Sequence, residues 1–154
     1  MNIAELISPA AVVPRLRVGG KKQLLQEIAK RAAELSGFGE RQIFDVLLER
    51  ERLGSTGVGN GIAIPHGRLP GLQRLHGLFA RVEPPVDFDS VDQQPVDLVF
   101  LLLAPEAAGA DHLKALARVS RLLRDAQVCE KLRGAESRDA LYALLTDAPA
   151  SHAA

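Results

Sequence analysis

The run from Val96 to Leu103 constrains the fold of this chain more than any other segment. Apart from Asp97, all its residues are apolar, so a strand formed here would have no polar face to turn toward water. The run has the length of a strand, since a helix that spans a bilayer needs about 20 apolar residues. This pattern predicts a central strand in a sheet that is covered on both faces.

The remaining apolar patterns predict an alternation of helices and strands around that central strand. Helices are expected over 21–36, 40–53, 111–124, 127–133 and 137–146, and strands over 12–16, 62–65, 78–83, 86–88 and 96–103. Pro14 confines the first strand to a sheet edge. We therefore predict a single α/β domain over residues 1–147, a mixed β-sheet flanked by helices on both faces. Residues 148–154 are expected to form a flexible C-terminal tail.

The composition narrows the possible functions. Among the 154 residues, 47% are hydrophobic and 25% charged, and the formal net charge is +0, so nothing suggests a nucleic-acid partner. The only cysteine, Cys129, has no partner for an internal disulfide. The first residues lack a basic targeting region, and no apolar run is long enough to embed the chain in a membrane. These features favour a cytoplasmic protein.

The segment from Gly54 to Gly67 carries the strongest indication of chemistry. Its glycines allow the backbone to approach a ligand closely and to present N–H groups to an anion. An apolar stretch follows, punctuated by Pro65, and His66 then stands at the expected strand end as a candidate phosphoryl acceptor. The candidate phosphate-binding residues are Ser55, Thr56, Gly57, Gly59 and Gly61. Alternatively, His66 is an ordinary surface histidine and the two hydroxyls only stabilise a turn.

Two more residues strengthen this hypothesis. Arg50 lies seven positions after Ile43, where the helical pattern asks for an apolar residue, so its guanidinium is expected to point toward the sheet and neutralise a phosphoryl group. The alternative is an arginine that follows the core edge and pairs with a nearby carboxylate.

His112 is placed in the first turn of a helix, where the helix dipole disfavours protonation, so its neutral ring could donate to His66 or to a phosphate. It could equally be a histidine without a role. If the strands before His66 and His112 are parallel, the two side chains should meet.

Other kinds of site are not supported by the sequence. The four histidines and the cysteine have no metal-ligand spacing, and no cofactor motif is recognisable. The glycine loop is not followed by the Gly-Lys-Ser/Thr of a Walker loop. His76 and His152 are expected to be surface residues.

The block Ile62-Ala-Ile-Pro-His66, with its preceding glycine loop, resembles the IIA proteins of the bacterial phosphoenolpyruvate-dependent phosphotransferase system, fructose/mannitol class. It looks most like their nitrogen-regulatory branch. The stretches Gln94-Pro-Val-Asp-Leu98 and His112-Leu-Lys-Ala-Leu116 support the resemblance, which covers about residues 2–147.

The resemblance implies specific roles and partners. His66 would be the phosphorylated histidine, Arg50 would support the phosphohistidine, and His112 would be a second active-site histidine. The donor would be an HPr-like phosphocarrier of the nitrogen branch. The protein would be a component of the phosphotransferase system that acts as a phosphoryl carrier more than as a turnover enzyme. Its phosphorylation state would regulate nitrogen-, potassium- or carbon-linked targets, such as a potassium transport protein or a sensor kinase.

Two rival functions remain open. A sugar-transport IIA component would pass its phosphoryl group to a cysteine of a IIB partner. An interaction module would bind an anion in the glycine loop without any transfer.

Overall fold

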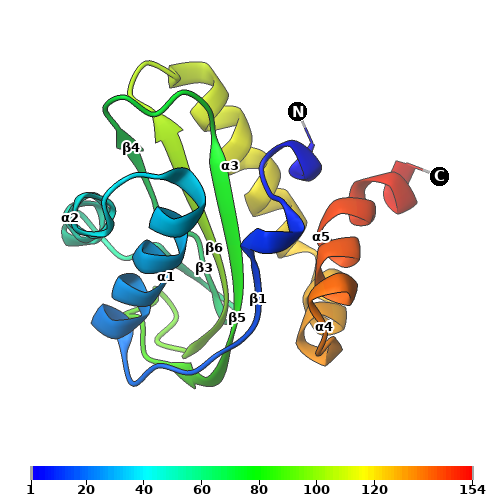
Figure 1. The fold of residues 1–154 in the computed structure, drawn as a ribbon. Helices are drawn as coiled ribbons and strands as arrows, with labels where there is room; N and C mark the ends of the chain where they lie inside the picture. Colours follow the sequence, from blue (N-terminus) through cyan, green and yellow to red (C-terminus); the bar gives the residue numbers. More distant parts are fainter. Residues whose placement is uncertain (1, 154) are drawn as a thin grey trace.

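The computed structural model describes residues 2–153 and has a six-stranded sheet at its centre (Figure 1). The strands lie in the order β1-β5-β6-β3-β2, and β4 also pairs with β6. Their bounds are β1 Val12–Leu16, β2 Gly57–Gly59, β3 Ile62–Ala63, β4 His66–Leu69, β5 His76–Val86 and β6 Val96–Pro105. The helices are η1 Ile3–Glu5, η2 Pro9–Ala11, α1 Lys21–Ser36, α2 Glu40–Arg52, α3 Gly109–Arg124, α4 Ala126–Gly134 and α5 Arg138–Ala153.

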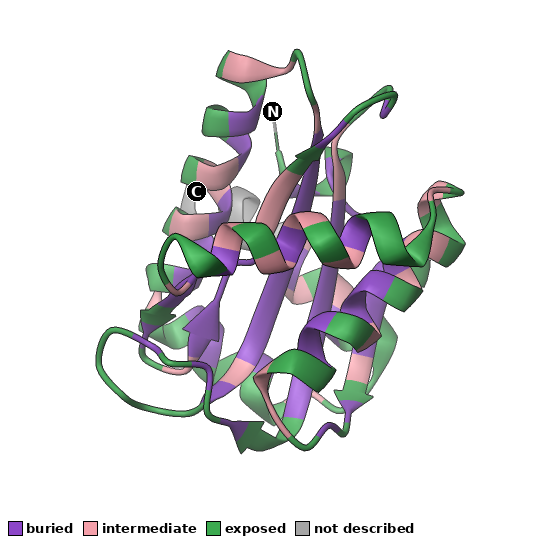
Figure 2. Cartoon of the chain, turned by 90° about the vertical axis from the view of Figure 1, so that its left-hand side faces the viewer, coloured by how far each residue is buried: buried purple, intermediate pink, exposed green. Residues whose placement is uncertain are grey.

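Helices cover both faces of the sheet, as predicted. Figure 1 shows α1 and α2 on one face and α3, α4 and α5 on the other. Figure 2 looks through α1 and α2 onto strands that are almost entirely buried. The central strand is the expected one, because β6 has neighbours on both edges and its residues from Leu98 to Ala104 are at most 1% exposed. The prediction of an α/β domain with a mixed sheet is confirmed, and β1 lies at the sheet edge as Pro14 indicated.

The strand that leads to His66 is interrupted, which the sequence did not predict. Both β3 and β4 run parallel to β6 along the same edge, with Ile62 opposite Leu98 and His66 opposite Leu102. The expected strand over 62–65 therefore ends early, and His66 begins a second segment instead of following the first. The break falls at Ile64 and Pro65, where proline has no N–H to donate. The Ile64 amide instead donates to the Thr56 carbonyl at 3.0 Å.

The predicted division of residues 78–88 into two strands is wrong. A single strand, β5, continues through Pro84 and Pro85. Its pairing with β6 is regular up to Arg81 and resumes only at Val86, so the two prolines lie in an irregular stretch where the ladder needs no N–H group.

All five predicted helices are present as α1 to α5 and differ in their ends, whereas the short 3-10 helices η1 and η2 were not predicted. α3 begins two positions earlier than expected, and α5 continues past the expected end at Thr146. Because the backbone of 138–153 is helical, the helix includes most of the predicted tail, residues 148–154. Ala154 lies outside the described residues, and the flexibility of this segment stays a prediction.

Candidate functional site

His66 and Arg50 are in contact, although 16 positions separate them in the chain. Arg50 stands in the last turn of α2 and donates from Nε to His66 Nε2 at 3.4 Å, a long hydrogen bond. Its Nη1 donates to the Gly54 carbonyl at 2.9 Å, which fixes the guanidinium beside the imidazole. The helical periodicity predicted that Arg50 points toward the sheet, and the structure adds that it contacts His66 there.

The backbone selects one tautomer of His66. Nδ1 lies 2.8 Å from the carbonyl oxygen of Ile64, and a carbonyl can only accept, so Nδ1 carries the proton. In the neutral ring this leaves a lone pair on Nε2, the nitrogen that faces Arg50. The Ile64 carbonyl belongs to the break between β3 and β4, so the interruption of the strand supplies the acceptor that orients the ring.

His112 lies against His66, as the sequence suggested for parallel strands. The two rings meet edge to face, with centroids 5.7 Å apart. His112 is buried in the first turn of α3, and its Nδ1 accepts a hydrogen bond from Arg68 Nε at 3.2 Å. The proton of neutral His112 is therefore on Nε2, which is buried and has no hydrogen-bond partner among the described residues. An unsatisfied donor of this kind is costly unless a ligand accepts from it.

Arg68 is a site residue that the sequence analysis missed. It lies two positions after His66 on β4, and strand geometry directs side chains two apart to the same face. That spacing could have identified it, had His66 been placed at the start of a strand and not after the end of one.

Both site histidines are held in the neutral state. Burial is the main cause that lowers the pKa of His66 below its usual 6.5, and the Arg50 charge lowers it further. The hydrogen bond to Ile64 and the carboxylate of Glu51 partly oppose this shift. Burial likewise lowers the pKa of His112, with contributions from His66 and Arg68. At neutral pH both rings are uncharged, so His66 Nε2 keeps an unprotonated lone pair, which accepts the Arg50 N–H in this structure.

The hydroxyls of the glycine loop are used to hold the loop itself. The Thr56 hydroxyl donates to the buried carboxylate of Glu51, and the Thr56 amide donates to the same carboxylate at 3.0 Å. The Ser55 hydroxyl donates to the Phe88 carbonyl at 2.8 Å. Lys21 completes the network through an ion pair of 3.0 Å with Glu51. These contacts favour the turn-stabilising alternative for Ser55 and Thr56.

The loop glycines do not gather around His66. Gly57 and Gly59 bound the short strand β2, and Gly61, with a φ of 80°, closes the hairpin turn into β3. That turn lies beside the beginning of β6, since the amide of Asp97 donates to the Gly61 carbonyl. His66 pairs four residues further along β6 than Ile62, roughly 13 Å away at strand spacing. The structure therefore does not bring Gly59 and Gly61 to the site.

Gly67 lets α2 approach the sheet closely. A Cβ at this position would lie 2.2 Å from Cγ1 of Val46, on the face of β4 opposite His66. Because Val46 and Arg50 share α2, this close approach sets how near the guanidinium comes to the imidazole.

Other kinds of site find no support in the part of the chain that is described. No three His, Cys, Asp or Glu side chains within it are grouped so as to hold a metal ion. Likewise, none of its helices is long and apolar enough to cross a membrane.

The geometry defines a nucleophilic nitrogen surrounded by groups that bind anions. One arginine contacts Nε2 of His66, and the neighbouring His112 ring carries a buried N–H without an acceptor among the described residues. Arg68 adds a second guanidinium behind His112. Phosphoryl transfer depends mainly on positioning and charge neutralisation, which this arrangement can provide.

Comparison with known proteins agrees with this chemistry. Residues 5–148 match the family described as phosphoenolpyruvate-dependent sugar phosphotransferase system, EIIA 2. The chain is 59% identical to a nitrogen regulatory protein of Bradyrhizobium diazoefficiens, over 99% of this chain and 100% of that protein. It is 43% identical to a nitrogen regulatory protein of Pseudomonas aeruginosa, over 96% of each. The crystal structure of nitrogen regulatory protein IIA-Ntr from Neisseria meningitidis superposes with a TM-score of 0.89 at 38% identity, over 94% of this chain and 99% of that one.

The chain belongs to the EIIA 2 family of the phosphoenolpyruvate-dependent phosphotransferase system. Within this class it is a homologue of the nitrogen regulatory IIA proteins, along its full length. The resemblance noted at the Ile62–His66 block is thereby confirmed at the level of the family.

Proposed function

We propose that His66 accepts a phosphoryl group on Nε2 from the phosphohistidine of an HPr-like carrier of the nitrogen branch. The observation that carries this proposal is the hydrogen bond from Nδ1 to the Ile64 carbonyl, which leaves the Nε2 lone pair directed at Arg50. The neutral state of the ring, favoured by burial, makes this lone pair available at neutral pH.

The transfer balances without an additional proton carrier. The Arg50 N–H leaves the lone pair of His66 Nε2, which then forms a bond to phosphorus while the phosphorus–nitrogen bond of the donor breaks. The donor ring, protonated on its other nitrogen, keeps the electron pair of the broken bond and leaves as neutral imidazole. His66 retains its Nδ1 proton, so its phosphorylated ring takes imidazolium character. The Ile64 carbonyl, 2.8 Å from Nδ1, stabilises that positive ring.

The charge of the phosphoryl group is met by residues already in place. The group adds roughly two negative charges. Arg50 is in contact with the accepting nitrogen, and the unsatisfied Nε2–H of His112 is free to donate to a phosphoryl oxygen. Arg68 acts through His112 by fixing its tautomer, which makes it a positioning residue.

Two exposed leucines beside the site support docking of protein partners there. Leu53, directly after α2, is 82% exposed, and Leu113, next to His112, is 66% exposed. A carrier that covers these leucines would exclude water from the transfer, and a target that docks there would meet the added charge directly. We infer a cytoplasmic regulator whose phosphorylation state is read by nitrogen-, potassium- or carbon-linked targets, such as a potassium transport protein or a sensor kinase.

The test is phosphoryl transfer in a purified system. Phosphoenolpyruvate, an enzyme I homologue and the carrier are incubated with the protein, and intact mass is followed with and without acid treatment. We expect an acid-labile gain of one phosphoryl group, localised to His66 by fragmentation and absent from His66→Ala. Far-UV circular dichroism checks that the variant is folded.

The outcomes separate the rival functions. A label on another histidine, or one that persists in His66→Ala, would contradict the assignment of His66. If the carrier is charged and no label appears, the chain is an anion-binding module. If a phosphorylated sample loses its label to a IIB protein with a nucleophilic cysteine, the sugar-transport alternative is supported.

A further inference from the structure

Glu51 is a buried carboxylate on a helix face that is otherwise apolar. It follows Ile43 and Leu47 on the buried side of α2, where the helical pattern calls for another apolar residue, and its side chain is only 4% exposed. Burying a carboxylate costs free energy, and replacing a buried ion pair by well-packed apolar residues is often neutral or stabilising. Packing alone therefore does not account for a glutamate at this position.

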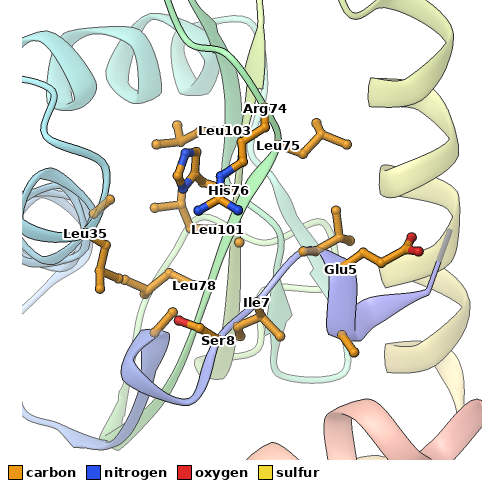
Figure 3. A pocket seen from close by; sticks show the side chains of 15 residues that line it. Glu5, Ile7, Ser8, Leu35, Arg74, Leu75, His76, Leu78, Leu101 and Leu103 are labelled. Atoms are coloured by element: carbon orange, nitrogen blue, oxygen red, sulfur yellow. The ribbon is translucent and has the colours of Figure 1, made fainter.

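The protein itself supplies the donors that surround this carboxylate. Oε1 accepts from the Thr56 amide at 3.0 Å and lies 3.0 Å from Nζ of Lys21, and Oε2 accepts from the Thr56 hydroxyl. The cavity of about 170 Å³ in Figure 3 is lined by residues of η1, η2, α1, β5 and β6, and Lys21, Glu51 and Thr56 are not among them. The carboxylate thus acts on Thr56 and not on a ligand in that cavity. We call its two hydrogen bonds to Thr56 the Glu51–Thr56 link.

The Glu51–Thr56 link closes the turn that holds Arg50. The Glu51 side chain reaches five positions forward to Thr56, and Gly54 lies inside this turn with a φ of 147°, a value that favours glycine. The Gly54 carbonyl accepts from Arg50 Nη1 at 2.9 Å. Because this carbonyl orients the guanidinium, opening the turn would release Arg50 from its contact with His66.

Thr56 also holds the segment that orients His66. The Thr56 carbonyl accepts from the Ile64 amide at 3.0 Å, and the Ile64 carbonyl accepts from His66 Nδ1 at 2.8 Å. Thr56 is 3% exposed, so water hardly competes for its hydrogen bonds. One buried residue therefore connects the two groups that must meet at the phosphorus, the guanidinium of Arg50 and the ring of His66.

We propose that Thr56, held by Glu51, is a positioning residue for phosphoryl transfer that fixes the guanidinium of Arg50 relative to the accepting ring of His66. This inference rests on the proposed phosphorylation of His66. A displacement of about 1 Å in an active site can lower a rate by roughly 100-fold, so a residue that touches neither reacting group can still control the transfer.

Lys21 removes the disadvantage of placing a carboxylate close to a site for an anion. Burial lowers the pKa of His66 and the charge of Glu51 opposes that shift, so the carboxylate is near enough to act on the ring. An unpaired carboxylate at that distance would repel the phosphoryl group. The ammonium of Lys21, whose side chain is 20% exposed, neutralises it.

The test uses variants of Thr56 with and without the hydroxyl. Thr56→Val removes this donor and keeps the shape of the side chain, Thr56→Ser keeps the donor, and Thr146→Val removes a hydroxyl that donates within α5. All are studied under conditions where circular dichroism shows them folded. We expect label uptake from the charged carrier to be about 3- to 10-fold slower in Thr56→Val, the effect of one hydrogen bond, and within about twofold of wild type in Thr56→Ser and Thr146→Val.

Two further measurements separate positioning from general stability. If Thr56 acts through Arg50, the double variant Thr56→Val/Arg50→Gln should lose less than the product of the two separate losses. In the unphosphorylated chain, the nitrogen chemical shift of His66 Nε2 should move in Thr56→Val toward its value in Arg50→Gln and stay in place in Thr56→Ser. The chemical shift needs no transfer, so it tests the positioning of Arg50 separately from the phosphorylation of His66.

The proposal is overturned if Thr56→Val matches Thr146→Val in rate or in the His66 chemical shift. It is also overturned if Thr56→Ser is as slow as Thr56→Val, or if the losses of Thr56→Val and Arg50→Gln multiply in the double variant. A wild-type chain that stays unlabelled by a charged carrier contradicts the proposed function, and the His66 chemical shift then decides the positioning by itself.

Discussion

Arg68 fixes the tautomer of His112 by donating from Nε to its Nδ1 at 3.2 Å. The consequence is a protonated Nε2 that is buried and unpaired within the described structure, on a ring whose centroid lies 5.7 Å from that of His66. A buried donor without an acceptor is unfavourable, and a phosphoryl oxygen on modified His66 could accept a hydrogen bond from it.

We expect Arg68→Gln to slow phosphorylation of His66 by about tenfold, the effect of one charge-assisted hydrogen bond. The nitrogen chemical shifts of His112 should change from one defined tautomer to a mixture. Arg118→Gln, on α3 but without a contact to His112, serves as the control. Unchanged His112 shifts in Arg68→Gln would show that the contact does not select the tautomer.

Arg50→Gln should slow the same reaction by roughly 10- to 100-fold, because a guanidinium that contacts the accepting nitrogen is lost. Arg52→Gln is a matched control two positions further along, since Arg52 is exposed and pairs, among the described residues, with Glu49 in α2. Rates are measured from initial label uptake. Equal rates for both variants would rule out a role for the Arg50 contact.

Thr56→Val should destabilise the fold by about 1–3 kcal/mol, because the buried carboxylate of Glu51 loses a hydroxyl donor. Urea unfolding gives this free energy. Thr146→Val is the comparison, since the Thr146 hydroxyl donates only to the Tyr142 carbonyl one helical turn earlier. A folded Thr56→Val protein should still be phosphorylated. A rate loss larger than that of Arg50→Gln would instead place Thr56 in direct contact with the phosphoryl group.

Gly67→Ala should cost about 1–3 kcal/mol, because its methyl group would overlap Cγ1 of Val46. Displacement of α2 would also move Arg50 from His66 and reduce phosphorylation. The double variant Gly67→Ala/Val46→Ala should regain part of both losses, which a double-mutant cycle measures. Additive effects would show that the two side chains do not compete for the same space.

Stability should fall as the pH decreases below about 6.5, the ordinary pKa of histidine. In the folded state the pKa values of His66, His76 and His112 are all lowered, so the unfolded chain binds more protons in that range. Stability therefore rises with pH through the window between the folded pKa values and 6.5. Histidine NMR titrations and unfolding midpoints test this. A site histidine that titrates above 6.5 would contradict it.

Phosphorylation should lose rate over the same window. Protonation of His66 removes the lone pair of Nε2, so acceptor activity falls as the pH passes below the lowered pKa. The carrier must be shown to stay charged at each pH. A rate that remains constant below the pKa measured for His66 would mean that the nucleophile is another group.

The sequence was sufficient to predict the features that depend only on the local apolar pattern. The apolar run of β6 predicted the central strand, and the spacing from Ile43 predicted where Arg50 points. The sequence was insufficient for features that depend on which distant strands pair with each other. The break between β3 and β4 depends on β6 supplying a partner on both sides of Pro65, and it determined both the position of His66 and the face of Arg68.

The loop hydroxyls illustrate another limit. A Ser-Thr pair such as Ser55-Thr56 occurs both in loops that bind phosphate and in turns that the hydroxyls only stabilise. The buried carboxylate of Glu51, which accepts from Thr56, favours the second role here. The burial of the Glu51 side chain depends on how α2 packs against the rest of the fold, and the spacing of residues along the sequence does not predict it.

The acceptor that orients His66 is a main-chain carbonyl, that of Ile64. Replacing the side chain of Ile64 leaves that carbonyl in place, so substitutions at this position still leave Nδ1 of His66 protonated and Nε2 as the reactive nitrogen. Only a change in the course of the chain, such as an insertion or a loss of the break between β3 and β4, would change which nitrogen is reactive. Point substitutions at Ile64 therefore leave the choice of reactive nitrogen unchanged, whereas insertions or deletions between Ile64 and His66 would alter it. Variants that keep the function should keep the spacing between these two residues.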